Sequence, residues 1–139
     1  MQQNAKRQKI KTKKILIITT NDISYLGADT AGQQHLKYSE DALIIRVPDP
    51  VIFPPDFYVR TLEKGFGGII VASAGDESPF LNSHARLAKN IDAAYKIMNE
   101  KGIDTKRLVL TAICSICAGS FIKAVNNMTK YLDSVHEQE

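Results

Sequence analysis

The sequence predicts an α/β domain with a single open parallel four-stranded sheet in β-α-β-α-β-α-β-α order. Helices are expected on both faces, a flavodoxin-like or Rossmann-like arrangement. Three observations predict this fold. Four short apolar runs alternate with longer amphipathic segments. The runs are continuous rather than alternating, which is typical of strands buried on both faces of a parallel sheet. The length of 139 residues is that of one domain.

The apolar runs place the strands. Strands are expected at 15–18, 42–45, 68–72 and 108–113, where isoleucine, leucine and valine dominate. None of these runs approaches the roughly 18 apolar residues of a membrane-spanning helix.

The intervening segments predict the helices. The segment 56–64 follows two prolines and precedes a glycine, the usual arrangement at the two ends of a helix. The segments 83–101 and 118–135 carry apolar residues at three- and four-residue spacing. The segment 25–37 gives a weaker helix prediction, because it contains two glycines.

Charge divides the chain into two parts. Residues 1–14 carry six basic side chains and no acidic one, whereas residues 15–139 carry 12 basic and 15 acidic side chains. We therefore expect a flexible basic N-terminal arm, 1–14, followed by a mildly acidic domain, 15–139. The arm could bind nucleic acid or an acidic partner, or be a solvated tail. Nucleic acid is the less favoured partner, because the domain shows no basic stripe and no aromatic platform.

Cysteine content and the N-terminus indicate the compartment. Two cysteines, Cys114 and Cys117, do not make a disulfide framework, and no apolar stretch of a signal peptide follows the basic arm. A reducing, cytoplasmic location is therefore expected.

Function in such folds lies in the loops that follow the strands. The loop 19–26 contains neither a dinucleotide-binding nor a phosphate-binding glycine pattern. The loop 48–55 has four prolines in eight residues, and Asp49 is its only titratable group. Its apolar residues, 51–53, could form a docking surface or fold back onto the core.

The third loop contains carboxylates. Asp76 and Glu77 are adjacent, which is typical of a solvated turn rather than of general acid–base catalysis. His84 follows near a helix start, where a surface or capping role is usual. No nucleophile–base set and no metal-spaced histidine cluster emerges, so no catalytic residue is predicted.

The fourth loop holds the sharpest motif, Cys114-Ser-Ile-Cys117, between a strand and a helix. A helix start lowers the pKa of a nearby thiol and favours redox chemistry. One such motif also supplies two of the four ligands of a zinc or cluster site, the rest coming from a partner. The third interpretation is two structural, half-buried thiols.

From residue 15 to residue 132 the chain resembles the iron–sulfur delta subunit of methyl-viologen-reducing (F420-non-reducing) hydrogenase. The segment 24–32 reads Ser-Tyr-Leu-Gly-Ala-Asp-Thr-Ala-Gly and matches the family motif Ser-Tyr-x-Gly-Ala-Asp-x-Ala-Gly. Further matching segments are 44–47, 55–57, 63–72 and 101–108.

This resemblance implies a [2Fe-2S] cluster that passes electrons from a hydrogenase or formate dehydrogenase to the flavin subunit of heterodisulfide reductase. The family's cysteines lie in the first three loops. At those places this sequence carries Thr20, Ile23, Asp49, Ala74 and Pro79. Cluster ligands are normally thiolates, so the sequence is a degenerate form in which the cluster is expected to be absent from its usual site.

Three functional hypotheses follow. The first is a non-catalytic adaptor subunit that docks, through the carboxyl ends of its strands, on a heterodisulfide-reductase-like flavin subunit or on a hydrogenase or dehydrogenase subunit. The second is an electron-transfer subunit with a relocated or interface-shared [2Fe-2S] or dithiol site at Cys114 and Cys117. The third is a regulatory or nucleic-acid-binding module that uses the basic arm.

Overall fold

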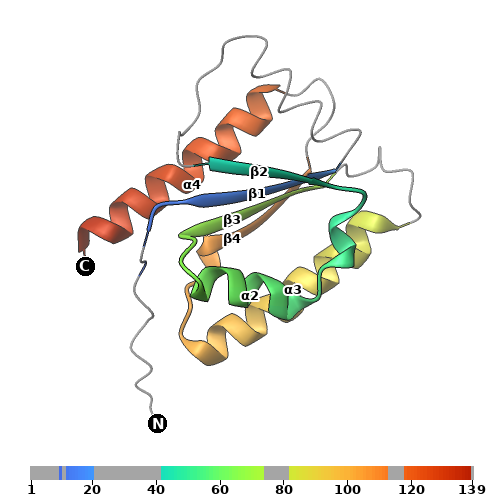
Figure 1. Cartoon of the computed structure of the whole chain (residues 1–139), viewed down its shortest axis with the longest axis horizontal. Coiled ribbons are helices and arrows are strands. Elements are labelled where there is room, and N and C mark those ends of the chain that lie inside the picture. The colour runs from blue at the N-terminus through green and yellow to red at the C-terminus, as the bar shows by residue number, and fades with distance from the viewer. Residues whose placement is uncertain (1–9, 11, 21–41, 74–81, 113–117, 139) are drawn as a thin grey trace.

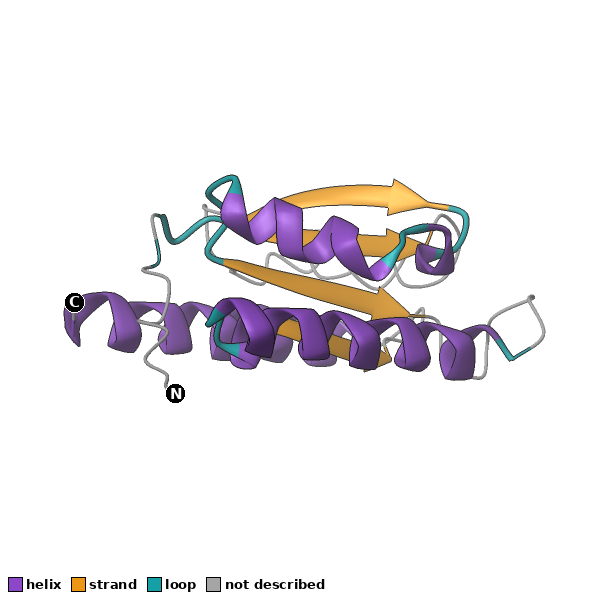
Figure 2. Ribbon diagram, turned by 90° about the horizontal axis from the view of Figure 1, so that it is seen from below, coloured by secondary structure: helices purple, strands orange, loops and turns teal. Residues whose placement is uncertain are grey.

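The computed structural model describes residues 10, 12–20, 42–73, 82–112 and 118–138. Within these ranges the chain forms a four-stranded, all-parallel sheet in the order β2-β1-β3-β4 (Figure 1). The strand arrows all point in one direction (Figure 2). The strands are β1 (Ile15–Thr20), β2 (Ala42–Val47), β3 (Gly68–Ser73) and β4 (Leu108–Ala112). The predicted α/β fold is thereby confirmed.

Three α-helices are described, together with two short 3-10 turns. The α-helices are α2 (Pro55–Glu63), α3 (Ser83–Lys101) and α4 (Ala118–Gln138), and the turns are η1 (Pro50–Ile52) and η3 (Thr105–Arg107). Each α-helix lies within three residues of its prediction at either end. The predicted helix at 25–37 lies outside the described residues. In the described part of the chain, no helix combines the length and apolarity needed to cross a bilayer.

The sheet separates two apolar layers. Ile15 and Ile17 of β1 point to the layer that α4 covers, whereas Leu16 and Ile18 point to the layer that α2 and α3 cover. Alternate residues of a strand point to opposite faces, so a continuous apolar run supplies both layers. Helices therefore lie on both faces of the sheet, as predicted.

Burial distinguishes the central strands from the edge strands. Every residue of β1 and β3 is buried. Leu43 of β2 is 53% exposed and Val109 of β4 is 37% exposed. The prediction that all four runs are buried on both faces is wrong for β2 and β4, because these strands occupy the two edges of the described sheet.

The last residues of the basic arm contact the domain. Ile10 is buried in the layer under α4. The Thr12 hydroxyl donates a hydrogen bond to the Gly65 carbonyl oxygen at 2.6 Å. Lys13 forms a salt bridge with Asp133 of α4, with 3.0 Å between Nζ and Oδ1. These contacts join the arm to the loop before β3 and to α4.

Candidate functional site

Buried polar side chains gather where the strands end. Because the sheet is parallel, the carboxyl ends of its strands meet at one edge, and α3 begins at this edge (Figure 1). The buried polar residues of this carboxyl edge are Thr19, Thr20, Asp49, Ser73 and Ser83. The edge is where ligands and partners usually bind in open α/β sheets.

Asp49 follows β2 and makes two hydrogen bonds at this edge. It is only 6% exposed. Its Oδ1 accepts a hydrogen bond from the Val51 backbone N–H at 3.0 Å and caps the turn η1. Its Oδ2 accepts a hydrogen bond from the Ser83 hydroxyl at 2.6 Å. The carboxylate therefore joins the segment after β2 to the first residue of α3.

Ser73 and His84 form a second link between β3 and α3. The Ser73 hydroxyl lies 2.8 Å from Nδ1 of His84, and the tautomer of the ring decides which group donates. The expectation for His84 is a surface or capping role, whereas the residue is half-buried and pairs with a strand residue. The pair could not be predicted from the sequence, because no motif or spacing links Ser73 to His84.

Tyr58 of α2 brings an unpaired hydroxyl into the core. Its side chain is fully buried, and its hydroxyl has no hydrogen-bond partner among the described residues. Burial raises the pKa of this phenol far above its ordinary value, and the negative charge of Asp49 raises it further. The helix periodicity identifies Tyr58 only as an apolar helix residue and does not reveal this hydroxyl.

The apolar residues after β2 divide between two roles. The Phe53 ring stacks on the Phe57 ring with 4.2 Å between centroids, so this residue folds back onto α2. Ile52 is 60% exposed and faces solvent. The interpretation that the loop folds back onto the core is therefore confirmed for Phe53. The docking surface stays a prediction, for which Ile52 supplies an exposed apolar side chain three residues from Asp49.

The structure describes part of the place to which the resemblance assigns the cluster. Of the five positions, the structure describes Thr20 and Asp49, and neither carries a thiolate. Both carboxylate oxygens of Asp49 already accept hydrogen bonds from the chain itself. Across the described residues, no three histidine, cysteine, aspartate or glutamate side chains gather in a metal-binding group.

Several predicted site residues lie outside the described residues. These are Ile23, Ala74, Asp76, Glu77, Pro79, Cys114 and Cys117. β4 ends at Ala112 and α4 begins at Ala118, so both cysteines belong to the segment of the chain that links these two elements.

Comparison with known proteins gives consistent results. Residues 15–135 match the family model described as the delta subunit of methyl-viologen-reducing hydrogenase. The chain is 28% identical over 116 residues to the iron-sulfur subunit of the vhu F420-non-reducing hydrogenase of Methanococcus maripaludis. The match covers 83% of this chain and 87% of that relative.

A second group of relatives is much longer. The chain is 26% identical over 122 residues to one subunit of the ferredoxin/F(420)H(2)-dependent CoB-CoM heterodisulfide reductase of Methanosarcina acetivorans. It is 25% identical over 122 residues to the corresponding subunit of the ferredoxin:CoB-CoM heterodisulfide reductase of Methanosarcina mazei. Each match covers 87% of this chain but 15% of the relative, so the chain spans a small part of these reductase subunits.

Proposed function

Because the chain belongs to the family of the delta subunit of methyl-viologen-reducing hydrogenase, we propose that it is a cluster-free docking subunit of a cytoplasmic oxidoreductase complex. Its carboxyl edge holds a redox partner in place and transfers no electrons through the family's usual cluster site. The most suitable partner is a heterodisulfide-reductase-like flavin subunit, with a hydrogenase or dehydrogenase subunit as the other class.

The hydrogen bonds of Asp49 carry this proposal. At a position where the resemblance places a cluster cysteine, this chain has a buried carboxylate whose two oxygens accept from Val51 and Ser83. At this position, where the family has a cluster ligand, Asp49 instead holds η1 against α3. We infer that hydrogen bonds within the chain, rather than a cluster, stabilise the carboxyl edge.

The relatives support the choice of partner. Their names identify iron-sulfur subunits of hydrogenases and subunits of heterodisulfide reductases. In the reductase relatives, the segment similar to this chain makes up 15% of one polypeptide. These relatives contain a similar segment fused to a reductase subunit. This fusion favours a reductase subunit as the partner of the present chain.

A second candidate is electron transfer through Cys114 and Cys117. The observation that favours it is the position of the pair, between the last residue of β4 and the first of α4. The strand that precedes the pair, β4, ends at the carboxyl edge to which Asp49 belongs. A partner that covers this edge could contribute further ligands to a shared cluster or exchange electrons with a dithiol.

Iron, zinc and sulfide content, with the absorption spectrum, separates the two candidates. The chain is purified without oxygen, alone and after co-production with a heterodisulfide reductase flavin subunit. A colourless, metal-free chain in both samples supports the cluster-free proposal. About one to two irons per chain with cluster absorption, the content of a two-iron site, contradicts it. Loss of that iron in the double variant Cys114→Ser and Cys117→Ser would assign the cluster to the cysteine pair.

Docking is tested with two matched variants. Ile52→Asp places a charge on the exposed apolar residue beside Asp49, and Leu43→Asp makes the same change at a similarly exposed residue at the amino end of β2. We expect Ile52→Asp to weaken co-purification with the reductase about tenfold or more, and Leu43→Asp to leave it unchanged. Equal effects, or none, would exclude docking through the carboxyl edge.

A further inference from the structure

The two edges of the described sheet are protected differently. β2 carries an exposed arginine, Arg46, and two prolines, Pro48 and Pro50, follow it closely. Charged residues and prolines at an edge strand prevent another strand from pairing with it. β4 reads Leu-Val-Leu-Thr-Ala, without charge or proline, and among the described residues it pairs with β3 alone. Its outer side therefore keeps the features of a pairing edge.

Grooves flank β4 on both faces. A groove of about 550 Å³ lies between β4 and α4, and a groove of about 410 Å³ lies between β4 and α3. Val109 and Leu110 line both of them. The groove under α4 exists because this helix packs over β1 and β3, where Met128 meets Gly68, and leaves Val109 uncovered. Side chains of an added strand would point alternately into the two grooves.

Within the described part of the chain, the outer backbone of β4 has one side-chain partner, at its first residue. The Tyr95 hydroxyl of α3 donates a hydrogen bond to the Leu108 carbonyl oxygen at 2.7 Å. No described side chain binds the backbone of the rest of the strand, 109–112. An incoming strand can therefore pair with the outward N–H and C=O groups of this stretch.

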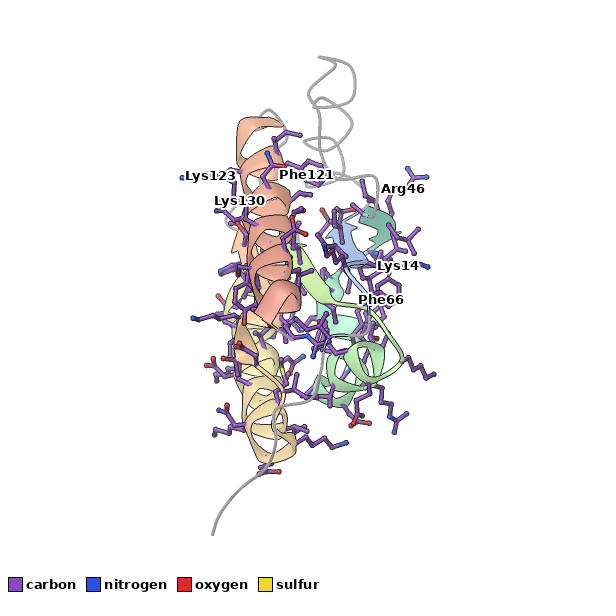
Figure 3. The ribbon with its side chains drawn as sticks, turned by 90° about the vertical axis from the view of Figure 1, so that its left-hand side faces the viewer. Lys14, Arg46, Phe66, Phe121, Lys123 and Lys130 are labelled. Carbon is purple, nitrogen blue, oxygen red and sulfur yellow. The ribbon has the colours of Figure 1, made fainter. Side chains whose placement is uncertain are left out.

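The groove under α4 is positively charged. Lys106 and Lys123 line it, and none of its described lining residues is a carboxylate. Lys106 lies 5.8 Å from the centre of the Tyr131 ring, whereas Lys123 precedes Tyr131 by about two helical turns, so the two lysines mark opposite ends. The nearby Asp104 accepts hydrogen bonds from the Tyr131 hydroxyl and from the Lys106 backbone N–H. Figure 3 shows Lys123 and Lys130 projecting from α4 on the side away from Arg46.

The positive charge of the groove under α4 determines which kind of segment can bind beside β4. A second copy paired antiparallel across a two-fold axis would bring Lys123 of one chain toward Lys106 of the other, and the like charges would repel. The chain's own arm is also basic, with six basic and no acidic residues in 1–14. We propose that the β4 edge binds an extended segment of a partner protein that alternates apolar and acidic residues and adds to the sheet as a fifth strand.

A peptide of defined chemistry tests the proposal on the full chain. The probe is a peptide of about ten residues, the length of a long strand, that alternates valine and glutamate. A matched peptide alternates valine and lysine. Amide hydrogen exchange reports on β4, and fluorescence anisotropy gives the Kd at low and high salt. We expect the glutamate peptide alone to bind, to slow exchange of the outward β4 amides, and to lose affinity as salt rises.

Charge-reversal variants locate the site. Lys106→Glu with Lys123→Glu should weaken binding of the glutamate peptide at least about tenfold, because both ends of the groove change sign. The control, Lys14→Glu with Lys64→Glu, changes two exposed lysines away from β4 and should leave the Kd unchanged. Val109→Lys places a charge on the edge and should abolish binding. Urea midpoints confirm that each variant is folded.

Four results would overturn the proposal: no peptide binding, equal binding of both peptides, outward β4 amides already protected in the free chain, or a dimer that Val109→Lys dissociates. The outer side of β4 is a different surface from the carboxyl edge that holds Asp49. A failed peptide test with intact Ile52-dependent docking would therefore remove this inference and leave the proposed function standing.

Discussion

The Ser83 hydroxyl donates a hydrogen bond of 2.6 Å to Asp49, and this buried contact joins two residues that are 34 positions apart. Asp49 follows β2 and Ser83 begins α3, so the contact closes the carboxyl edge around one carboxylate. A second oxygen of the same group holds the Val51 N–H. Loss of the carboxylate would leave two donors without an acceptor.

Asp49→Ala should therefore lower the free energy of unfolding by about 3 kcal/mol, and Ser83→Ala by about 2 kcal/mol, because each leaves a buried polar group unpaired. Urea unfolding at neutral pH measures both values. The double variant should cost at least about 1 kcal/mol less than the sum, since the two residues share one contact. Asp49→Asn should cost less than Asp49→Ala, because an amide keeps one oxygen. Strict additivity would show that the pair does not interact in solution.

Tyr58→Phe should stabilise the chain by about 1 kcal/mol at neutral pH, because it removes a buried hydroxyl that has no partner among the described residues. The effect of the substitution changes at high pH. Burial and Asp49 raise the pKa of the folded phenol above the ordinary value of 10.0, so folding favours the protonated form. Below about pH 10 the phenol keeps its proton in both the folded and the unfolded chain. As the pH rises from there toward the folded pKa, the unfolded chain loses this proton first, and the free energy of unfolding of the unchanged chain declines.

Unfolding free energies at pH 7 and at about pH 11 test this, the second lying above the pKa of an unfolded tyrosine. The stability advantage of Tyr58→Phe over the unchanged chain should be larger at the higher pH. At pH 7, Tyr95→Phe is the matched control: its hydroxyl pairs with the Leu108 carbonyl oxygen, so its removal should cost about 1 kcal/mol. If Tyr58→Phe were destabilising as well, the Tyr58 hydroxyl would have a partner in solution.

The fold could be predicted because apolar runs and helix periodicity are local features of the sequence. The site could be predicted only in part, because it depends on contacts between residues far apart in the chain. Apolar runs and helix periodicity place β1, α3 and α4, because these signals lie within one segment. The edge position of β2 and β4 depends on which strands become neighbours, and an apolar run has no feature that reveals it. Asp49 is recognisable in the sequence as a loop carboxylate, but its acceptor role depends on Ser83, which tertiary folding brings beside it.

Arg107→Ala should lower the free energy of unfolding by about 3 kcal/mol, since hydrogen bonds to charged groups are stronger than neutral ones. Arg107 is buried, and its Nε and Nη2 donate to the carbonyl oxygens of Gly67 and Phe66 at 2.7 and 3.0 Å. It thereby fixes the start of β4 against the loop before β3. Arg107→Lys should recover less than half of the loss, because an ammonium group cannot reproduce the planar two-donor geometry. Urea unfolding compares the two variants, and full recovery would show that charge alone matters.

Gly67 and Gly68 both lie too close to their neighbours for an added side chain, but Met128→Ala should relieve the crowding at only one of them. A Cβ on Gly68 would lie 2.6 Å from the Met128 sulfur, and a Cβ on Gly67 would clash with the Thr12 backbone oxygen. Each alanine variant should be destabilised by about 2 kcal/mol through overpacking. Met128→Ala should offset most of the added cost at Gly68, because it removes the clashing side chain, but none of the cost at Gly67. Urea unfolding of the two double variants checks this. Equal rescue at both glycines would mean that α4 shifts as a whole, and no rescue at Gly68 would place the clash elsewhere.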